Sequence, residues 1–203
     1  MRYYKIQLEI LESKPYKKFL EQIVHDWPGV SDNIAYHLSY LEYLYQVFDQ
    51  PRLVDYPVHC GLRIKTLVAE IASCAEVLLY DAIINLSVSD EWGGKHSMSL
   101  DTKVGFAVLL TYAFEFGVID KGLRGRLHKL FDLRNKIHLT HKRRDPYEFN
   151  VRLLKDSEKT LEDLFRHFLR QRRRKIVSRA RQRVTEKDIV LPWKRVKIAY
   201  RGC

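Results

Sequence analysis

Apolar residues recur three and four positions apart along most of this chain. That spacing predicts amphipathic helices, because such residues share one face of an α-helix. Near the start, Tyr4, Ile6, Leu8 and Ile10 alternate with polar residues, which fits a short strand or the beginning of a helix. Helices are expected at about 16–26, 32–48, 62–86, 102–116, 120–141 and 150–184. Helices of this length joined by short loops predict an all-α protein, built as an antiparallel bundle.

Capping residues set the expected helix ends. Ser31 and Asp120 are expected to be N-caps, and Ser99 or Asp101 should cap the helix between them. Gly117 should end that helix, because glycine tolerates the left-handed conformation that follows many helices.

The chain divides into three expected segments. Pro51, Pro57 and Gly61 indicate a linker. Residues 1–57 are then an N-terminal extension, helical with a possible short strand, which forms either an extra helical layer or a partner-docking surface. Residues 58–170 are the helical core. Residues 171–203 are a basic C-terminal arm followed by an extended or strand-like tail.

The extension is rich in tyrosine, at Tyr36, Tyr40, Tyr43 and Tyr45. We expect these rings to form a packed aromatic face rather than a platform for stacking bases.

Positive charge is concentrated at one end of the chain. The whole chain has a net charge of +11, and the segment from Leu164 to Cys203 holds 14 of its 36 basic residues but 2 of its 25 acidic ones. The rest of the chain is close to neutral. Such an asymmetry is typical of a basic arm that contacts a polyanion, whereas membrane binding would need more large apolar residues after Phe168.

The remaining composition argues against several classes of protein. The cysteines, Cys60, Cys74 and Cys203, are few and far apart, so neither a disulfide framework nor a zinc site is expected, and a reducing cytoplasm fits. No signal peptide or transmembrane stretch is apparent. No ligand spacing typical of a metal site occurs, and we expect no cofactor.

The most informative stretch is Phe131 to His141. At about 100° per residue, Arg134, His138 and His141 project within a stripe of about 60°. The apolar residues Leu127 and Leu130 project onto the same stripe. Since a buried charge without a partner is costly, this face should meet a pocket, a polar partner or another subunit.

Arginine and histidine together suit RNA cleavage. Arginine matches phosphate geometry with a fork of donors, and histidine transfers protons near neutral pH. RNA carries its own nucleophile, the 2′-hydroxyl. Asn135 lies at the flank of the stripe, where its amide can orient a group.

The motif Leu133-Arg134-Asn135-Lys136-Ile137-His138-Leu139-Thr140-His141 resembles the HEPN superfamily. Ribonuclease members carry an arginine, a polar residue directly after it, and a histidine after four to six intervening residues. Arg134, Asn135 and His141 match this pattern. His138 has a shorter spacing but shares the stripe. The resemblance covers roughly Leu62 to Phe168.

The resemblance implies a HEPN-type bundle that forms a homodimer, with the motif helices facing each other around a composite site. It implies metal-independent RNA cleavage by 2′-hydroxyl attack, often in toxin–antitoxin or antiviral systems, with an antitoxin or defence-complex protein as a candidate partner. Arg134 would stabilise the phosphorane, and His141 or His138 would be the general acid and base. Asn135 would position the phosphate or the histidine.

RNA contacts are expected mainly outside the motif. The basic residues assigned to them are Lys142, Arg143, Arg144, Arg172, Arg173, Arg174, Lys175, Arg179, Arg181 and Arg183. Two alternatives stay open. One is a catalytically inactive HEPN-like module that binds nucleic acid or a protein partner, and the other is DNA binding through the arm alone.

Overall fold

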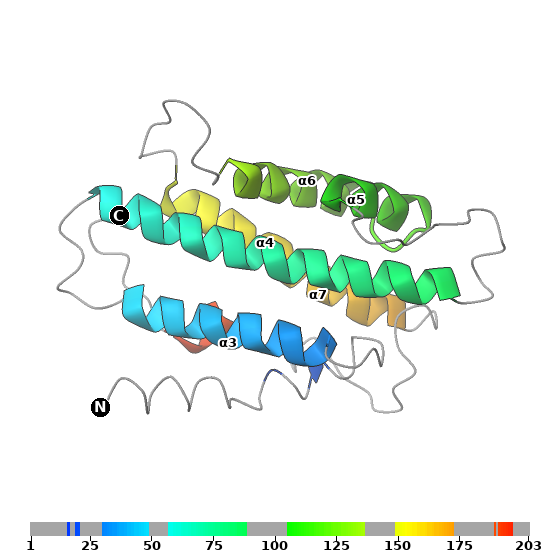
Figure 1. Ribbon diagram of the computed structural model, residues 1–203, viewed down its shortest axis with the longest axis horizontal. Helices are drawn as coiled ribbons and strands as arrows, with labels where there is room; N and C mark the ends of the chain where they lie inside the picture. The colour runs from blue at the N-terminus through cyan, green and yellow to red at the C-terminus, as the bar shows by residue number, and fades with distance from the viewer. Residues whose placement is uncertain are drawn as a thin grey trace.

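The computed structural model describes residues 30–48, 57–88, 105–136, 149–172 and 191–196, together with Tyr16, Phe19, Leu20 and Ile189. Within these residues the structure is helical and contains no strand, which confirms the all-α class for this part of the chain. The helices are α3 (Val30–Phe48), α4 (Pro57–Val88), α5 (Phe106–Glu115), α6 (Lys121–Asn135), α7 (Val151–Arg172) and α8 (Pro192–Arg195) (Figure 1).

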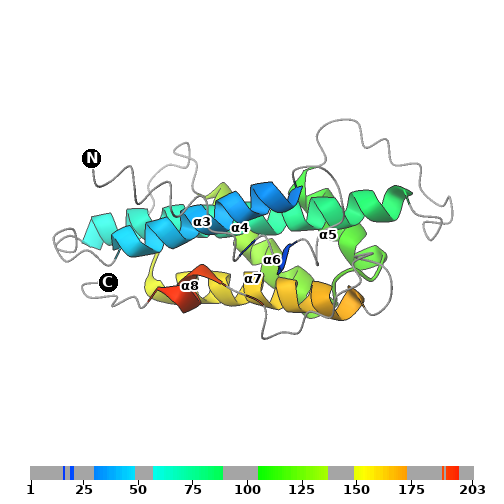
Figure 2. The same ribbon diagram turned by 90° about the horizontal axis from the view of Figure 1, so that it is seen from below.

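The long helix α4 is the centre of the arrangement. It packs against α3, α5, α6 and α7. The colour gradient in Figure 1 shows that α3 and α6 each run antiparallel to α4, and that α7 runs in the same direction as α4. Figure 2 shows α3 and α4 lying side by side above α7 and α8. Because α4 has neighbours on several sides, its buried residues cover more than one narrow stripe. Ile71 and Leu78 are buried, and so are Ala72 and Leu79, which lie about 100° further round the helix.

One hydrophobic core joins residues from all three expected segments. Tyr16, Phe19 and Leu20 are helical and buried, and so are Leu38 of α3 and Leu164 of α7. Leu191, just before α8, is completely buried in the same core. The bundle therefore includes the N-terminal extension and part of the tail.

Two of the predicted helix ends are confirmed. Asp120 is the N-cap of α6, and its Oδ1 accepts a hydrogen bond of 2.7 Å from the backbone N–H of Leu123. Gly117 follows α5 with a φ of +68°, the left-handed conformation that glycine adopts without steric penalty.

Three other predicted boundaries are wrong. α3 begins at Val30, so Ser31 lies in its first turn and is not its cap. α5 begins at Phe106 after an extended Gly105, so neither Ser99 nor Asp101 caps it. The linker expected around Pro57 and Gly61 is the first part of α4, because proline fits the first turn of a helix.

The tail also differs from the prediction of a strand or extended chain. Residues 192–195 form one helical turn, α8, with Pro192 buried at its start. The Trp193 ring packs edge-on against Tyr45 of α3, with 6.3 Å between the ring centroids. Lys194 Nζ donates a 2.6 Å hydrogen bond to Glu162 of α7, and Arg195 Nε lies 3.2 Å from a carboxylate oxygen of Glu42 on α3. These two cations of the basic segment thus bind acids of the bundle.

No disulfide framework was expected from the three scattered cysteines, and one of them, Cys60 near the start of α4, is nevertheless disulfide-bonded. Cys74 is a free, buried thiol, and Cys203 lies outside the described residues. Separation along the sequence does not limit which cysteines meet, because the fold brings distant segments together. Among the described helices, none combines the length and the apolar character needed to cross a membrane.

Candidate functional site

Helix α6 carries the described part of the motif. Its residues Leu123, Leu127 and Leu130 are buried against the bundle, as their four- and three-residue spacing predicts. Arg134 lies one turn beyond Leu130 on the same face, in the last turn of the helix. Packing of the leucines therefore fixes the direction in which Arg134 projects.

The acidic partner of Arg134 is Glu76, in the middle of α4. Arg134 Nη1 donates a hydrogen bond to Glu76 Oε2, and the two side chains are 32% and 30% exposed. The sequence predicted a second copy of the chain as the cover for this cationic stripe. For Arg134, the chain itself supplies a compensating charge, from a residue 58 positions away.

Aromatic rings also hold the guanidinium. Arg134 Cζ lies 5.9 Å from the centroid of the Phe131 ring, within cation–π range. Phe131 in turn stacks on Phe106 of α5, with 4.4 Å between centroids and an interplanar angle of 13°. Three helices, α4, α5 and α6, thus determine the position of one half-exposed guanidinium.

The rest of the motif is only partly described. Asn135 is exposed and is the last residue of α6, and Lys136 is its C-cap. The sequence placed this helix end near His141, six residues later. His138 and His141 lie outside the described residues, as do Lys142, Arg143 and Arg144. The structure therefore brings together Arg134 and Glu76, and Asn135 follows Arg134 as an exposed residue at the end of the helix.

Most of the predicted arm is also undescribed. Arg172 is the last residue of α7, and its side chain lies outside the description. The other arm residues, Arg173, Arg174, Lys175, Arg179, Arg181 and Arg183, fall outside the described residues too. The expected extension of this helix to Val184 stays a prediction.

A second cluster of polar and aromatic residues lies between α3 and α4, and its contact between His37 and Glu70 was not predicted from the sequence. His37 Nδ1 of α3 lies 2.8 Å from Glu70 Oε2 of α4. On the same helix as His37, Tyr36 is 55% exposed and Tyr40 is 41% exposed. Of the four tyrosines expected to form a packed face, Tyr45 is the one that is fully buried. Counting from Tyr36, the spacing of four and seven to Tyr40 and Tyr43 was the available signal, because it places these rings on one side of a helix.

Buried acids elsewhere are held by hydroxyl donors. Tyr16 donates a 2.6 Å hydrogen bond to Glu42, and Tyr45 donates one of the same length to Glu158 of α7. Burial, with the hydrogen bond to Glu42 next in importance, raises the pKa of the Tyr16 phenol well above its usual range. These contacts join Tyr16 to α3 and α3 to α7, and they have a structural role.

Among the described residues, no three histidine, cysteine, aspartate or glutamate side chains are grouped as metal ligands would be. Comparison with protein-family models, with curated proteins and with solved structures found no match to this chain.

Proposed function

We propose that this protein is a metal-independent endoribonuclease that uses the Arg134 end of α6. The observation that supports the proposal is the preorganised guanidinium of Arg134, half-exposed beside the exposed Asn135. The motif that continues to His138 and His141 carries the resemblance to HEPN ribonucleases, and the all-α bundle is compatible with it.

The chemistry follows from these groups. A histidine of the motif, His141 or His138, accepts the proton of the RNA 2′-hydroxyl as that oxygen attacks the adjacent phosphorus. The histidine, acting as general acid, donates a proton to the leaving 5′-oxygen, and the upstream strand ends in a 2′,3′-cyclic phosphate. Arg134 neutralises the charge that develops on the phosphorane oxygens. A guanidinium has five N–H donors, so Glu76 can hold one end while other donors face the phosphate.

The same contact also motivates a second candidate, an inactive HEPN-like module that binds RNA. Glu76 competes with phosphate for Arg134 and places a negative charge beside the proposed site. In an active enzyme, this carboxylate must stay paired with the arginine while RNA is bound. In an inactive module, the ion pair has a structural role only.

The test is RNA cleavage by the purified chain in excess EDTA. The expected result is cleavage that persists in the chelator and leaves 2′,3′-cyclic phosphate ends. Arg134→Gln and His141→Ala should each reduce the rate by roughly 100-fold or more, the usual range for oxyanion-stabilising and acid–base groups. His138→Ala, made separately, identifies which histidine transfers the proton.

Arg126→Gln is the matched control. Arg126 lies on the same helix, and its Nη2 pairs at 3.3 Å with Asp163 of α7, so it also joins α6 to a neighbouring helix through an acid. The Arg126→Gln variant should cleave RNA at the wild-type rate. RNA binding without cleavage in the wild-type chain would support the inactive module, and cleavage unchanged in Arg134→Gln would contradict the assigned role of Arg134.

A further inference from the structure

The outward side of α3 carries a row of tyrosines. Tyr36, Tyr40 and Tyr43 follow at intervals of four and three residues, so they share one side of the helix. Tyr36 and Tyr40 are 55% and 41% exposed, and Tyr43 is half-buried. The rings of Tyr40 and Tyr43 are stacked, with 6.3 Å between centroids and an interplanar angle of 20°. We call these three residues the tyrosine row.

The neighbours of the tyrosine row are of mixed character. Asn33 and Gln46 are exposed at either end of it, whereas Leu44, beside Tyr43, and Val47 are half-buried. A helix face that packs against another protein helix usually presents leucine or isoleucine at this spacing. The exposed large side chains of this face are instead tyrosines, whose rings can stack on flat groups.

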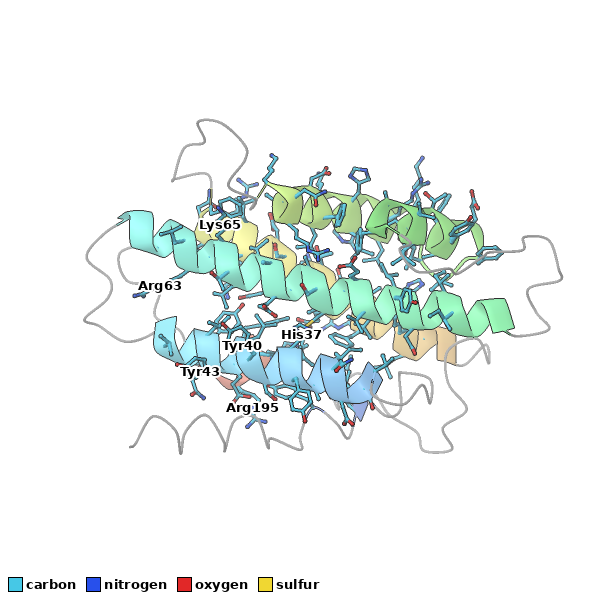
Figure 3. The ribbon with its side chains drawn as sticks, viewed as in Figure 1. His37, Tyr40, Tyr43, Arg63, Lys65 and Arg195 are labelled. Carbon is cyan, nitrogen blue, oxygen red and sulfur yellow. The ribbon has the colours of Figure 1, made fainter. Side chains whose placement is uncertain are left out.

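One border of the row faces α4. His37 lies opposite Glu70, and the two helices run antiparallel. On α3, Leu44 lies two turns after His37 and beside Tyr43. On α4, which runs antiparallel, Arg63 lies two turns before Glu70. Figure 3 shows Tyr40 and Tyr43 on α3, His37 between the two helices, and Arg63 at the same end of the pair. A histidine and an arginine thus border the tyrosine row.

Acidic groups near the row are few and paired. The acids of α3 are Asp32 and Glu42, and Glu42 is buried between Tyr16 and Arg195. On α4, Figure 3 shows Arg63 at this border and Lys65 on the side of the helix away from α3, and the acid Glu70 is paired with His37. Arg63 thus places a cation beside the row, in a chain whose net charge is +11, and this cation suits an anionic ligand.

We propose that the tyrosine row is a stacking platform for single-stranded RNA, with the sugar–phosphate backbone along the His37 and Arg63 border. Seven residues of helix rise by about 10 Å, which accommodates two or three bases at the ~3.4 Å spacing of stacked bases. Stacking on tyrosine needs the π-face of an unpaired base, so duplex RNA should not use the row. The proposal rests on RNA as the ligand of the proposed function and extends it by naming the single-stranded form.

The experiment measures binding of a fluorescent ten-nucleotide RNA by anisotropy at fixed salt, with the full chain carrying His141→Ala so that the probe stays intact. Tyr36→Ala combined with Tyr40→Ala should weaken binding at least tenfold, because each lost base stack costs about fivefold or more. Tyr36→Phe combined with Tyr40→Phe should bind within about twofold of the parent, because the rings remain.

Tyr80→Ala is the matched control, since Tyr80 is 39% exposed on α4, close to the exposure of Tyr40. It should leave binding unchanged. A duplex probe of the same length should be insensitive to all these substitutions. All the replaced tyrosines are well exposed, so the variants should keep the helical circular dichroism of the parent.

Unchanged single-strand affinity in the double alanine variant would overturn the proposal. If that variant also shifts in sedimentation from dimer to monomer, the row is assigned to a second copy of the chain instead. Failure of the ribonuclease proposal is distinguishable. A chain that binds through the tyrosines but cleaves nothing contradicts only the catalytic role, and a chain that cleaves with unchanged affinity in the double variant contradicts only the platform.

Discussion

At the scale of single residues, two glycines show how backbone conformation decides the effect of a substitution. Gly117 has a φ of +68° after α5, and Gly125 lies inside α6. A Cβ added at either position would meet no atom within 4 Å. Steric crowding is therefore excluded at both positions, and the conformational preference of the residue alone should determine the change in stability.

Gly117→Ala should lower the free energy of unfolding by about 1–2 kcal/mol, because alanine resists the left-handed conformation. Gly125→Ala should raise it by roughly 0.5–1 kcal/mol, because alanine is the better helix former. Urea unfolding of both variants measures the difference. Changes of the same sign in the two variants would contradict this account.

At the scale of an element, α8 is a single turn of four residues, and contacts with the rest of the bundle fix its position. Leu191 is completely buried, Trp193 packs on Tyr45, and Lys194 and Arg195 reach acids on two different helices. A single helical turn is not stable alone, since helix nucleation is unfavourable. The α8 turn is helical because these contacts with the rest of the bundle stabilise it.

Burial rather than charge should dominate the docking of α8. Leu191→Ala should reduce the unfolding free energy by about 2–5 kcal/mol, the usual cost of emptying a buried leucine site. Lys194→Ala should cost at most about 1 kcal/mol, because the Lys194 side chain is 49% exposed and exposed ion pairs contribute little. Chemical denaturation of the two variants gives the comparison, and an equal loss in both would show that the ion pair matters as much as the leucine.

At the scale of the whole molecule, two buried groups make the fold sensitive to alkali. Burial raises the pKa of the Tyr16 phenol and of the Cys74 thiol above their ordinary values of 10.0 and 9.0. For each group the folded state keeps its proton at a pH where the unfolded chain has lost it. Stability is therefore fully present below the ordinary pKa and falls as the pH rises above it.

The unfolding free energy of the wild type should decline above about pH 9–10. Tyr16→Phe removes one of the two groups and should make the decline shallower above pH 10. It should also lower stability at neutral pH by roughly 1–3 kcal/mol, because the buried Glu42 carboxylate loses a hydrogen bond. A Tyr16→Phe profile parallel to the wild type would contradict the role of Tyr16.

Local signals in the sequence were sufficient for the helical class and for some helix ends. Asp120 caps α6 and Gly117 follows α5 because capping depends on a few adjacent residues. The leucines of α6 are buried as their spacing predicts. Pro57 was misleading, because proline serves equally well in a linker and in the first turn of a helix.

The candidate site was predictable only in its residue types. Arg134 and Asn135 were singled out from the motif, but the pairing of Arg134 with Glu76 joins residues 58 positions apart. The spacing of residues along the sequence does not predict this pairing, because the pairing depends on how α4 and α6 are aligned in the bundle. The same holds for Glu42, which meets Tyr16 and Arg195 from opposite ends of the chain.

The sequence by itself therefore determined the longer helices α3 to α7, several of their ends and the residues of the motif, since these depend on spacing and on neighbouring side chains. Only the tertiary structure decided which faces of the helices are covered. It buried Tyr45 and left Tyr36 and Tyr40 exposed on the same helix, because α8 and α7 cover one side of α3 and the described elements leave the other side open. Coverage depends on contacts between distant segments, and for that reason the tyrosine row and the partner of Arg134 became visible only in the folded chain.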